Sequence, residues 1–336
     1  MFSLSSVMND FQIFALKALR RIVKKCGLAY LPPPMQREMD PDKASEIIYN
    51  LLTSDSPCMI ARFGAFELAT VVNYLGIKQG ERPLIEYIRG EALDWWWNER
   101  LIGYLNNNAG FFPATDQMLN RFCRMMLEDA KEVDVLACWT TDVMRLADYT
   151  PSDVVRTGLI CIEPYWAKKP WSRALAGKRV VVVHPFAELI EQQYREYRHE
   201  LFKNSDVLPE FSLRAIKAVQ SLGGESSGFG DWFEALDSMK KAIDSEPYDI
   251  ALIGCGAYGF PLAAHVKRTG HKAVHLAGAL QLLFGIRGKR WDNPEYAGNS
   301  DGTYANYNTL WNGSWVYPDT SLKVKNSQNI EGGCYW

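Results

Sequence analysis

Residues 252–278, "LIGCGAYGFPLAAHVKRTGHKAVHLAG", decide the fold class of this chain. They begin inside an apolar run, residues 248–253, that is typical of a buried strand. Three glycines with the spacing G-x-G-x-x-G follow at once: Gly254, Gly256 and Gly259. A loop of this kind between a strand and a helix brings backbone N–H groups and the positive end of the helix dipole together. The stretch therefore predicts an anion site, to which Ala257 and Tyr258 of the same loop also belong.

The rest of the chain alternates in the same way between apolar strands and helices. We expect strands at 58–63, 133–138, 178–184, 214–220, 248–253 and 272–276, and helices at 41–52, 66–76, 92–106, 116–131, 186–202, 232–243 and 261–268. Residues 151–170 are rich in loop formers. The alternation predicts an α/β, Rossmann-like fold, with a mostly parallel sheet covered by helices on both faces. Ligands of such sheets bind at the carboxyl ends of the strands.

Three parts of the chain differ in composition. Residues 1–34 combine a basic, amphipathic helix with a linker that ends in three prolines. Residues 35–292 carry the expected strands and form the Rossmann-like domain. Residues 293–336 are polar and aromatic, and we expect an irregular tail packed on that domain.

The first helix has an apolar side and a basic side. Its apolar side consists of Phe11, Phe14, Leu16, Leu19, Ile22 and Val23, with Lys17, Arg20, Arg21, Lys24 and Lys25 nearby. Such a helix can lie on an anionic membrane surface, where each basic residue contributes about 1 kcal/mol. It can equally pack on the domain with its basic side in water. No uncharged run approaches the roughly 20 residues of a membrane span, so we expect a cytoplasmic protein, with a peripheral position on the inner face of the membrane as the membrane-bound alternative.

Composition excludes several classes of protein. The 336 residues are 47% hydrophobic and 23% charged, as in an ordinary globular protein. A formal net charge of −2 argues against a partner nucleic acid, because phosphate binding needs clustered Lys and Arg. Seven cysteines without a C-x-x-C pair indicate neither a disulfide framework nor a zinc site, which fits a reducing cytoplasm.

A second turn that carries candidate functional residues lies in "CMIARFGAFELATVVNYLG", residues 58–76. Here a buried strand ends at Arg62, the chain turns at Gly64, and a helix begins with Glu67 in its first turn. Favourable interaction with the helix dipole, about 0.3–1 kcal/mol, is a purely structural reason for that glutamate. However, a buried Arg and a nearby Glu are costly unless they are paired or used. We therefore take Arg62 and Glu67 as candidate catalytic residues.

The ligand of the glycine loop is expected to be a nucleotide diphosphate. A dinucleotide fingerprint also requires an acid about 20 residues further on, but the next strand ends in His275 without a carboxylate. The sequence therefore argues against a nicotinamide dinucleotide as the ligand. Glycines that serve only tight packing are the alternative. His184, near the end of "RVVVVHPF", is a candidate contact to the nucleotide or to an acceptor substrate, or else it caps a helix. His275 is a candidate contact of the same kind, or else an interior residue.

A basic turn follows the glycine loop in "LLFGIRGKRWDNP". The glycines that bracket Arg287, Lys289 and Arg290 allow the backbone to turn and to aim these side chains at phosphate oxygens. A basic turn surrounded by water is the equally weighted alternative.

Several stretches together resemble a known family: "IARFGAFEL", "NNAGFFP", "PWSRALAGKRVVVVHPF", the glycine loop with its basic turn, and "EGGCYW". From about residue 40 onward the chain is similar to bacterial glycosyltransferase-like proteins of the GT-D fold type, which assemble capsule, O-antigen and glycoprotein glycans. In that family the first turn commonly reads Arg-Phe-Gly-Asp-Gly-Glu, and its Asp-x-Glu pair is associated with a divalent metal and the nucleotide-sugar diphosphate. This chain keeps Glu67 but has Ala65 in place of the Asp.

The resemblance implies a glycosyltransferase that moves a sugar from a nucleotide-sugar donor to a polysaccharide or lipid-linked glycan. A Mn²⁺ or Mg²⁺ ion would bind at Glu67, but the loss of the Asp shifts the neutralisation of the diphosphate toward Arg and Lys. Glu67 is then free to act as general base toward the acceptor hydroxyl. A catalytically inactive protein that binds nucleotides or glycans is the first alternative, and a dinucleotide-dependent oxidoreductase is the second.

Overall fold

A seven-stranded sheet forms the centre of the protein. The computed structural model describes residues 10–221, 228–293, 305–319, 322–323 and 333–336. The strand order is β3-β2-β1-β7-β6-β4-β5, and every pair is parallel. The strands are β1 Cys58–Arg62, β2 Val135–Ala137, β3 Val155–Thr157, β4 Arg179–His184, β5 Ser212–Lys217, β6 Ile250–Ile253 and β7 Lys272–His275. The α/β, Rossmann-like fold predicted from the sequence is therefore confirmed.

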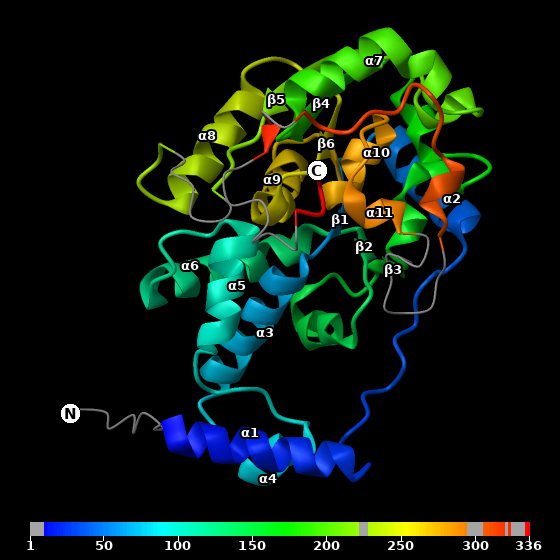
Figure 1. The fold of residues 1–336 in the computed structure, drawn as a ribbon. Coiled ribbons are helices and arrows are strands. Elements are labelled where there is room, and N and C mark those ends of the chain that lie inside the picture. The colour runs from blue at the N-terminus through cyan, green and yellow to red at the C-terminus, as the bar shows by residue number, and fades with distance from the viewer. Residues whose placement is uncertain (1–9, 222–227, 294–304, 320–321, 324–332) are drawn as a thin grey trace.

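Helices cover both faces of this sheet (Figure 1). One face packs against α3 Ala65–Gln79, α5 Glu99–Ala109, α6 Asp116–Asp129, α8 Trp232–Asp244 and α9 Gly259–Arg268. The other packs against α2 Pro41–Thr53, α7 Ala187–Leu201, α10 Leu280–Leu283 and α11 Lys289–Asp292. Two further helices, α1 Asp10–Lys25 and the short α4 Leu84–Arg89, lie together away from the sheet (Figure 1).

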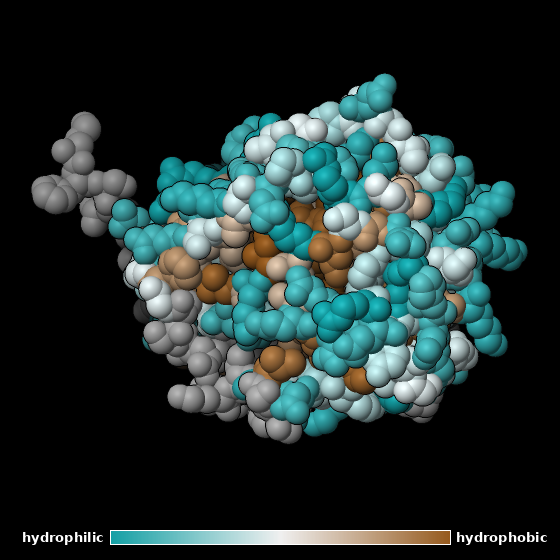
Figure 2. Space-filling model, turned by 90° about the horizontal axis from the view of Figure 1, so that it is seen from above, coloured by the Kyte–Doolittle hydropathy of each residue, from teal (hydrophilic) through white to brown (hydrophobic). Residues whose placement is uncertain are grey.

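Burial on both faces explains the unbroken apolar strands. In β4, Val181 and Val183 belong to the core under one helical layer, whereas Val180 and Val182 belong to the core under the other. Complete burial of such a side chain contributes about 1.5–3 kcal/mol. Figure 2 shows the face above the sheet as mostly hydrophilic, with hydrophobic residues gathered near its middle.

The predicted helix at 92–106 is wrong in its first half. Helix α5 begins at Glu99, and the preceding segment is irregular because the side chain of Asn73 holds it. The Asn73 amide donates to the carbonyl oxygens of Asp94 and Trp96, at 3.1 and 2.8 Å, and its oxygen accepts from the backbone N–H of Asn98. Strand β3 lies in the stretch expected to be loop, residues 151–170. This strand has only three residues, two of them partly buried, and so short a segment has too little alternation of apolar and polar side chains to be predicted as a strand.

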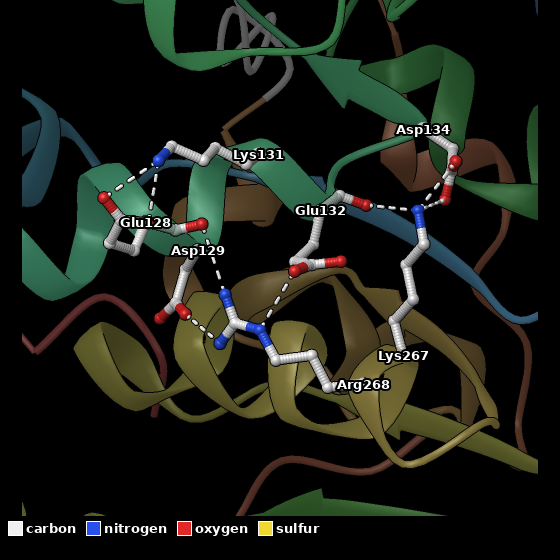
Figure 3. Close-up of polar contacts among 7 residues, drawn as sticks. All are labelled: Glu128, Asp129, Lys131, Glu132, Asp134, Lys267 and Arg268. Carbon is white, nitrogen blue, oxygen red and sulfur yellow. Dashed lines mark hydrogen bonds and ion pairs between the residues drawn. The ribbon is translucent and has the colours of Figure 1, made fainter.

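Charged groups form a paired network at the amino edge of the sheet (Figure 3). Lys267 lies 2.8 Å from Asp134, which precedes β2, and an oxygen of Asp134 accepts from the backbone of Met59 in β1. The guanidinium of Arg268 contacts Glu132 at 3.0 Å and the buried carboxylate of Asp129. These contacts fasten the carboxyl end of α9 to the end of α6.

We predict that Arg268→Met destabilises the protein by roughly 2 kcal/mol at pH 8 and by much less at pH 5. Burial raises the pKa of Asp129 to about 6, against the opposing effect of Arg268. The carboxyl is therefore ionised at pH 8 and loses its partner there, whereas at pH 5 it is mostly protonated. Urea unfolding at both pH values measures the difference. The control is Lys131→Met, whose exposed pair with Glu128 is worth less than about 0.5 kcal/mol. Equal losses for Arg268→Met at both pH values would contradict the prediction.

Candidate active site

The connections that leave β4 and β6 run in opposite directions. From β4 the chain passes through α7 to the outer strand β5, whereas from β6 it passes through α9 to β7, nearer the centre. Adjacent strands with opposite exits leave a crevice at their carboxyl ends, where sheets of this class bind ligands. His184 ends β4 and Gly254 follows β6 at this crevice.

Close packing requires two of the three glycines in the loop. A Cβ on Gly254 would lie 2.6 Å from the carbonyl oxygen of Ala277, and a Cβ on Gly259 would lie 2.0 Å from the ring of His275. Gly256 differs, because it is exposed and has a φ of 58°, in the left-handed region that favours glycine. Gly254 and Gly259 are therefore glycines because of close packing, whereas Gly256 lies at the exposed edge of the loop, where a ligand could bind.

The two other loop residues point into the core. Ala257 and Tyr258 are both buried, and the Tyr258 ring stacks on Trp232 with 4.8 Å between the centroids. The Tyr258 hydroxyl lies 3.1 Å from the hydroxyl of Ser221. Ala257 and Tyr258 thus leave their backbone amides, and not their side chains, for a ligand at this edge.

Both candidate histidines are buried and neutral. The Nδ1 atom of His184 accepts a hydrogen bond from the backbone N–H of Phe186 at 3.0 Å, and Nδ1 of His275 lies 3.1 Å from the carbonyl oxygen of Ile253. Burial lowers the pKa of His184 to about 3. Burial, with a smaller effect of Arg62, lowers the pKa of His275 to about 4. At pH 7 these rings therefore supply hydrogen-bonding groups but no positive charge.

Arg62 carries the positive charge at this edge. It ends strand β1, next to the central strand β7, and its charge reaches two groups, because it lowers the pKa of both His275 and Glu163. The Nε atom of Arg62 is buried and has no hydrogen-bond acceptor among the described residues. An unsatisfied guanidinium group at the carboxyl edge is suited to an anionic ligand.

Glu67 lies against the turn that follows. It is the third residue of α3, is buried, and folds back on the N-cap Gly64, since a Cβ there would lie 2.0 Å from Oε2. This placement is typical of a glutamate that supports a helix N-terminus. Ala65 is exposed beside it.

Glu163 was missed in the sequence and is the second carboxylate near Arg62. It follows β3 and is 5% exposed, and its Oε2 accepts from Trp166 Nε1 and from the Tyr307 hydroxyl, both at 2.9 Å. Burial raises its pKa to about 7 despite these bonds and the charge of Arg62. A single acid in the apolar stretch "LICIEPYW", residues 159–166, was the available signal.

The three residues of the basic turn have different surroundings. Arg287 pairs with Asp292 at 2.8 Å, and its guanidinium lies over the rings of Trp311 and Tyr317. Lys289 is exposed, and Arg290 donates to the Tyr335 hydroxyl at 3.1 Å.

The end of the chain lies beside the same edge. The Tyr335 ring covers Gly278 closely enough that a Cβ there would lie 2.4 Å from it, and the Tyr335 carbonyl accepts from Gln281. Trp336 is buried near Phe186, with 6.2 Å between the ring centroids. Part of the tail therefore packs on the domain next to the crevice.

A carboxylate clamp for Mn²⁺ or Mg²⁺ is not formed by the described residues. In that part of the chain, no group of three or more His, Cys, Asp or Glu side chains is arranged to hold a metal ion. Glu67 folds onto Gly64, and Ala65 has no ligand atom. The expected metal site therefore does not fit this turn.

Comparisons with known proteins add no relative. A scan against protein-family models found no match, and searches of curated proteins and of solved structures found none either. None of the helices in the described residues is long and apolar enough to cross a membrane.

We expect Gly254→Ala to destabilise the protein by about 1–3 kcal/mol, because the added Cβ would overlap a backbone oxygen that cannot move freely. The matched control is Gly313→Ala, where nothing lies within 4 Å of the new Cβ. Its effect should stay within about 0.5 kcal/mol. Thermal unfolding of both variants tests the packing role, and equal stability of the two would refute it.

Glu163→Gln should remove a pH dependence of stability. Because the pKa of Glu163 is raised from an ordinary value of 4.5 to about 7, its contribution to stability is complete only below about pH 4.5 and is lost as the pH rises from there through about 7. The wild type should therefore lose about 2 kcal/mol through this group between pH 5 and pH 8, and the variant should not. Urea unfolding across this range gives the answer. If the free energy of unfolding falls with pH in the variant as it does in the wild type, a group other than Glu163 titrates.

Proposed function

We propose that the protein is a glycosyltransferase that transfers a sugar from a nucleotide-diphosphate sugar to a polysaccharide or lipid-linked glycan of the bacterial surface, such as capsule or O-antigen. The resemblance of the two turns and the end of the chain to GT-D-type proteins motivates the reaction class. We place the enzyme in the cytoplasm, peripheral on the inner face of the membrane.

The observation that carries this proposal is the environment of Arg62. A buried guanidinium Nε without an acceptor in the described residues lies at the carboxyl end of β1, within electrostatic reach of Glu163 and His275. Burying such a donor unpaired costs about 1–3 kcal/mol. An anionic ligand that bonds to Arg62 recovers that cost.

Arg62 and the loop amides have a defined task in glycosyl transfer. Negative charge grows on the diphosphate as the bond to the sugar breaks, and preorganised donors at that place lower the barrier. The guanidinium of Arg62 supplies a full charge, and the backbone at Gly256 offers N–H groups at the exposed edge of the loop. The neutral ring of His184, whose Nδ1 accepts from Phe186, adds an Nε2–H donor without adding charge, whereas the one N–H of neutral His275 faces the carbonyl oxygen of Ile253.

The acceptor hydroxyl needs a base, and Glu163 is the better candidate of the two carboxylates. A general base works best with a pKa near the operating pH, and the pKa of Glu163 is about 7. Glu67 has its carboxylate on Gly64, where it supports the turn that carries Arg62. We therefore assign proton transfer to Glu163 and positioning of the turn to Glu67.

The test of the anion site is Arg62→Met. We expect kcat/KM for the nucleotide sugar to fall by about a hundredfold or more, because one charged donor to the leaving group is lost. The matched control is Arg156→Met on β3, another strand arginine whose Nε is buried without an acceptor in the described residues. Turnover of UDP-, GDP- and CMP-linked sugars by the control should equal that of the wild type. An equal loss in both variants would remove Arg62 from the mechanism.

A ligand screen separates the proposed reaction from its alternatives. Stabilisation by a nucleotide sugar in thermal unfolding, with turnover that Glu163→Gln abolishes and Glu67→Gln lowers partly, is the expected result. Binding without turnover, with or without manganese, would identify an inactive binding protein. Stabilisation by NAD alone would identify an oxidoreductase.

A further inference from the structure

Helix α1 turns one set of apolar residues away from the protein, while Ile13, Leu16 and Val23 are half-buried on its other side. Phe11 is 77% exposed, Phe14 67% and Ile22 56%, and these three residues fall within about 80° of the helix circumference. No residue of α1 is fully buried. The apolar residues of α1 are therefore divided, because Leu16 and Val23 are half-buried whereas Phe11, Phe14 and Ile22 are exposed.

Basic side chains of the same helix face the body instead. Lys17 lies over the ring of Trp96, and Arg20 lies over the ring of Tyr87 and 3.9 Å from Asp94. These aromatic contacts fix α1 against α4 and the irregular segment before α5, away from the sheet (Figure 1). The exposed apolar side is therefore a consequence of how α1 is held.

A hollow of about 440 Å³ lies between α1 and the body. Four cations line it, Lys17, Arg20, Arg21 and Lys24, together with two acids, Asp94 and Asp142. Arg21 and Lys24 have no hydrogen bond or ion pair to any residue that the structure describes. The hollow thus carries an excess of positive charge, with two cations available for a ligand.

We infer that α1 is a docking element for an anionic lipid bilayer. Phe11, Phe14 and Ile22 enter the boundary between headgroups and acyl chains, while Arg21 and Lys24 bind lipid phosphates at the rim of the hollow. An α-helix is about 10 Å wide, and an amphipathic helix on a membrane sinks about 5–10 Å into this boundary. Phe11, Phe14 and Ile22 therefore lie at the depth of the acyl chains, while the long side chains of Arg21 and Lys24 extend back to the phosphates.

The charges favour a bilayer over a second copy of this chain. A symmetric dimer through the apolar side of α1 would bring the Arg21, Lys24 and Lys25 of both copies together, and like charges at such contacts repel. An anionic membrane neutralises the same charges, each worth about 1 kcal/mol near the surface. The inference does not depend on the transferase reaction, since it uses residues outside the carboxyl edge of the sheet.

The experiment is co-sedimentation of the full chain with vesicles of phosphatidylcholine, with and without phosphatidylglycerol. We expect binding that requires phosphatidylglycerol, and we expect it to weaken about tenfold or more in Phe11→Ser/Phe14→Ser and in Arg21→Glu/Lys24→Glu. The control variants are Met144→Ser, another exposed apolar residue, and Lys203→Glu, an exposed residue two positions after α7, a helix that lies at the opposite end of the molecule from α1 (Figure 1). Both should bind as the wild type does, and circular dichroism confirms that each variant is folded.

Three results would overturn the inference: no binding by the wild type, equal binding to neutral vesicles, or wild-type binding by both double variants. A dimer in solution that Phe11→Ser/Phe14→Ser dissociates, without vesicle binding, would assign the apolar side to self-association. Because no sugar donor is present in this assay, its failure leaves the proposed reaction untouched, and failure of the reaction leaves the docking surface in place.

Discussion

Burial of the sheet on both faces is the constraint that organises this protein. Parallel strands covered by helices on either side have room for apolar side chains alone, so polar chemistry is confined to the two edges. At the amino edge the charged groups pair with one another, as Asp129 does with Arg268 (Figure 3). At the carboxyl edge the Nε of Arg62 lacks such an acceptor among the described residues. At the amino edge the charged groups are therefore paired, whereas at the carboxyl edge the Nε of Arg62 is left as a donor for an anionic ligand.

The carboxyl edge also concentrates features that oppose stability. Ala277 has a φ of 50°, a conformation that costs a non-glycine residue about 1–2 kcal/mol, and its carbonyl oxygen leaves no room for a Cβ at Gly254. Glu163 is buried with a raised pKa, and two histidines are held neutral. Strain and unfavourable burial that gather at one place are typical of functional sites. This clustering supports the choice of this edge over the amino edge as the site.

The sequence predicted the elements whose signals are local and repeated. The run "RVVVVH" of β4 and the cap of Asp40 before α2, which accepts from the backbone of Asp42, needed no tertiary information. The start of α5 was missed because Asn73, more than 20 residues earlier, imposes it through hydrogen bonds. In the site, the positions of Arg62 and the glycine loop followed from strand ends, but Glu163 did not, because its pairing with Tyr307 joins segments far apart in the chain. The contacts of Arg287 in the basic turn could not be predicted either, because they are made with Asp292 and with aromatic residues of the tail.

The pairing of β1 with β7 has a consequence for synthesis of the protein. Cys58 of β1 lies opposite Lys272 of β7, so β1 leaves the ribosome long before one of its two neighbours exists. At ordinary elongation rates the delay is roughly 10–40 s. Throughout that time the nascent chain presents an apolar strand with a free edge, which is a template for misassembly. A chaperone that shields the first half of the chain until β7 emerges would therefore raise the yield of folded protein more than it would for a fold whose strands pair in the order of their synthesis.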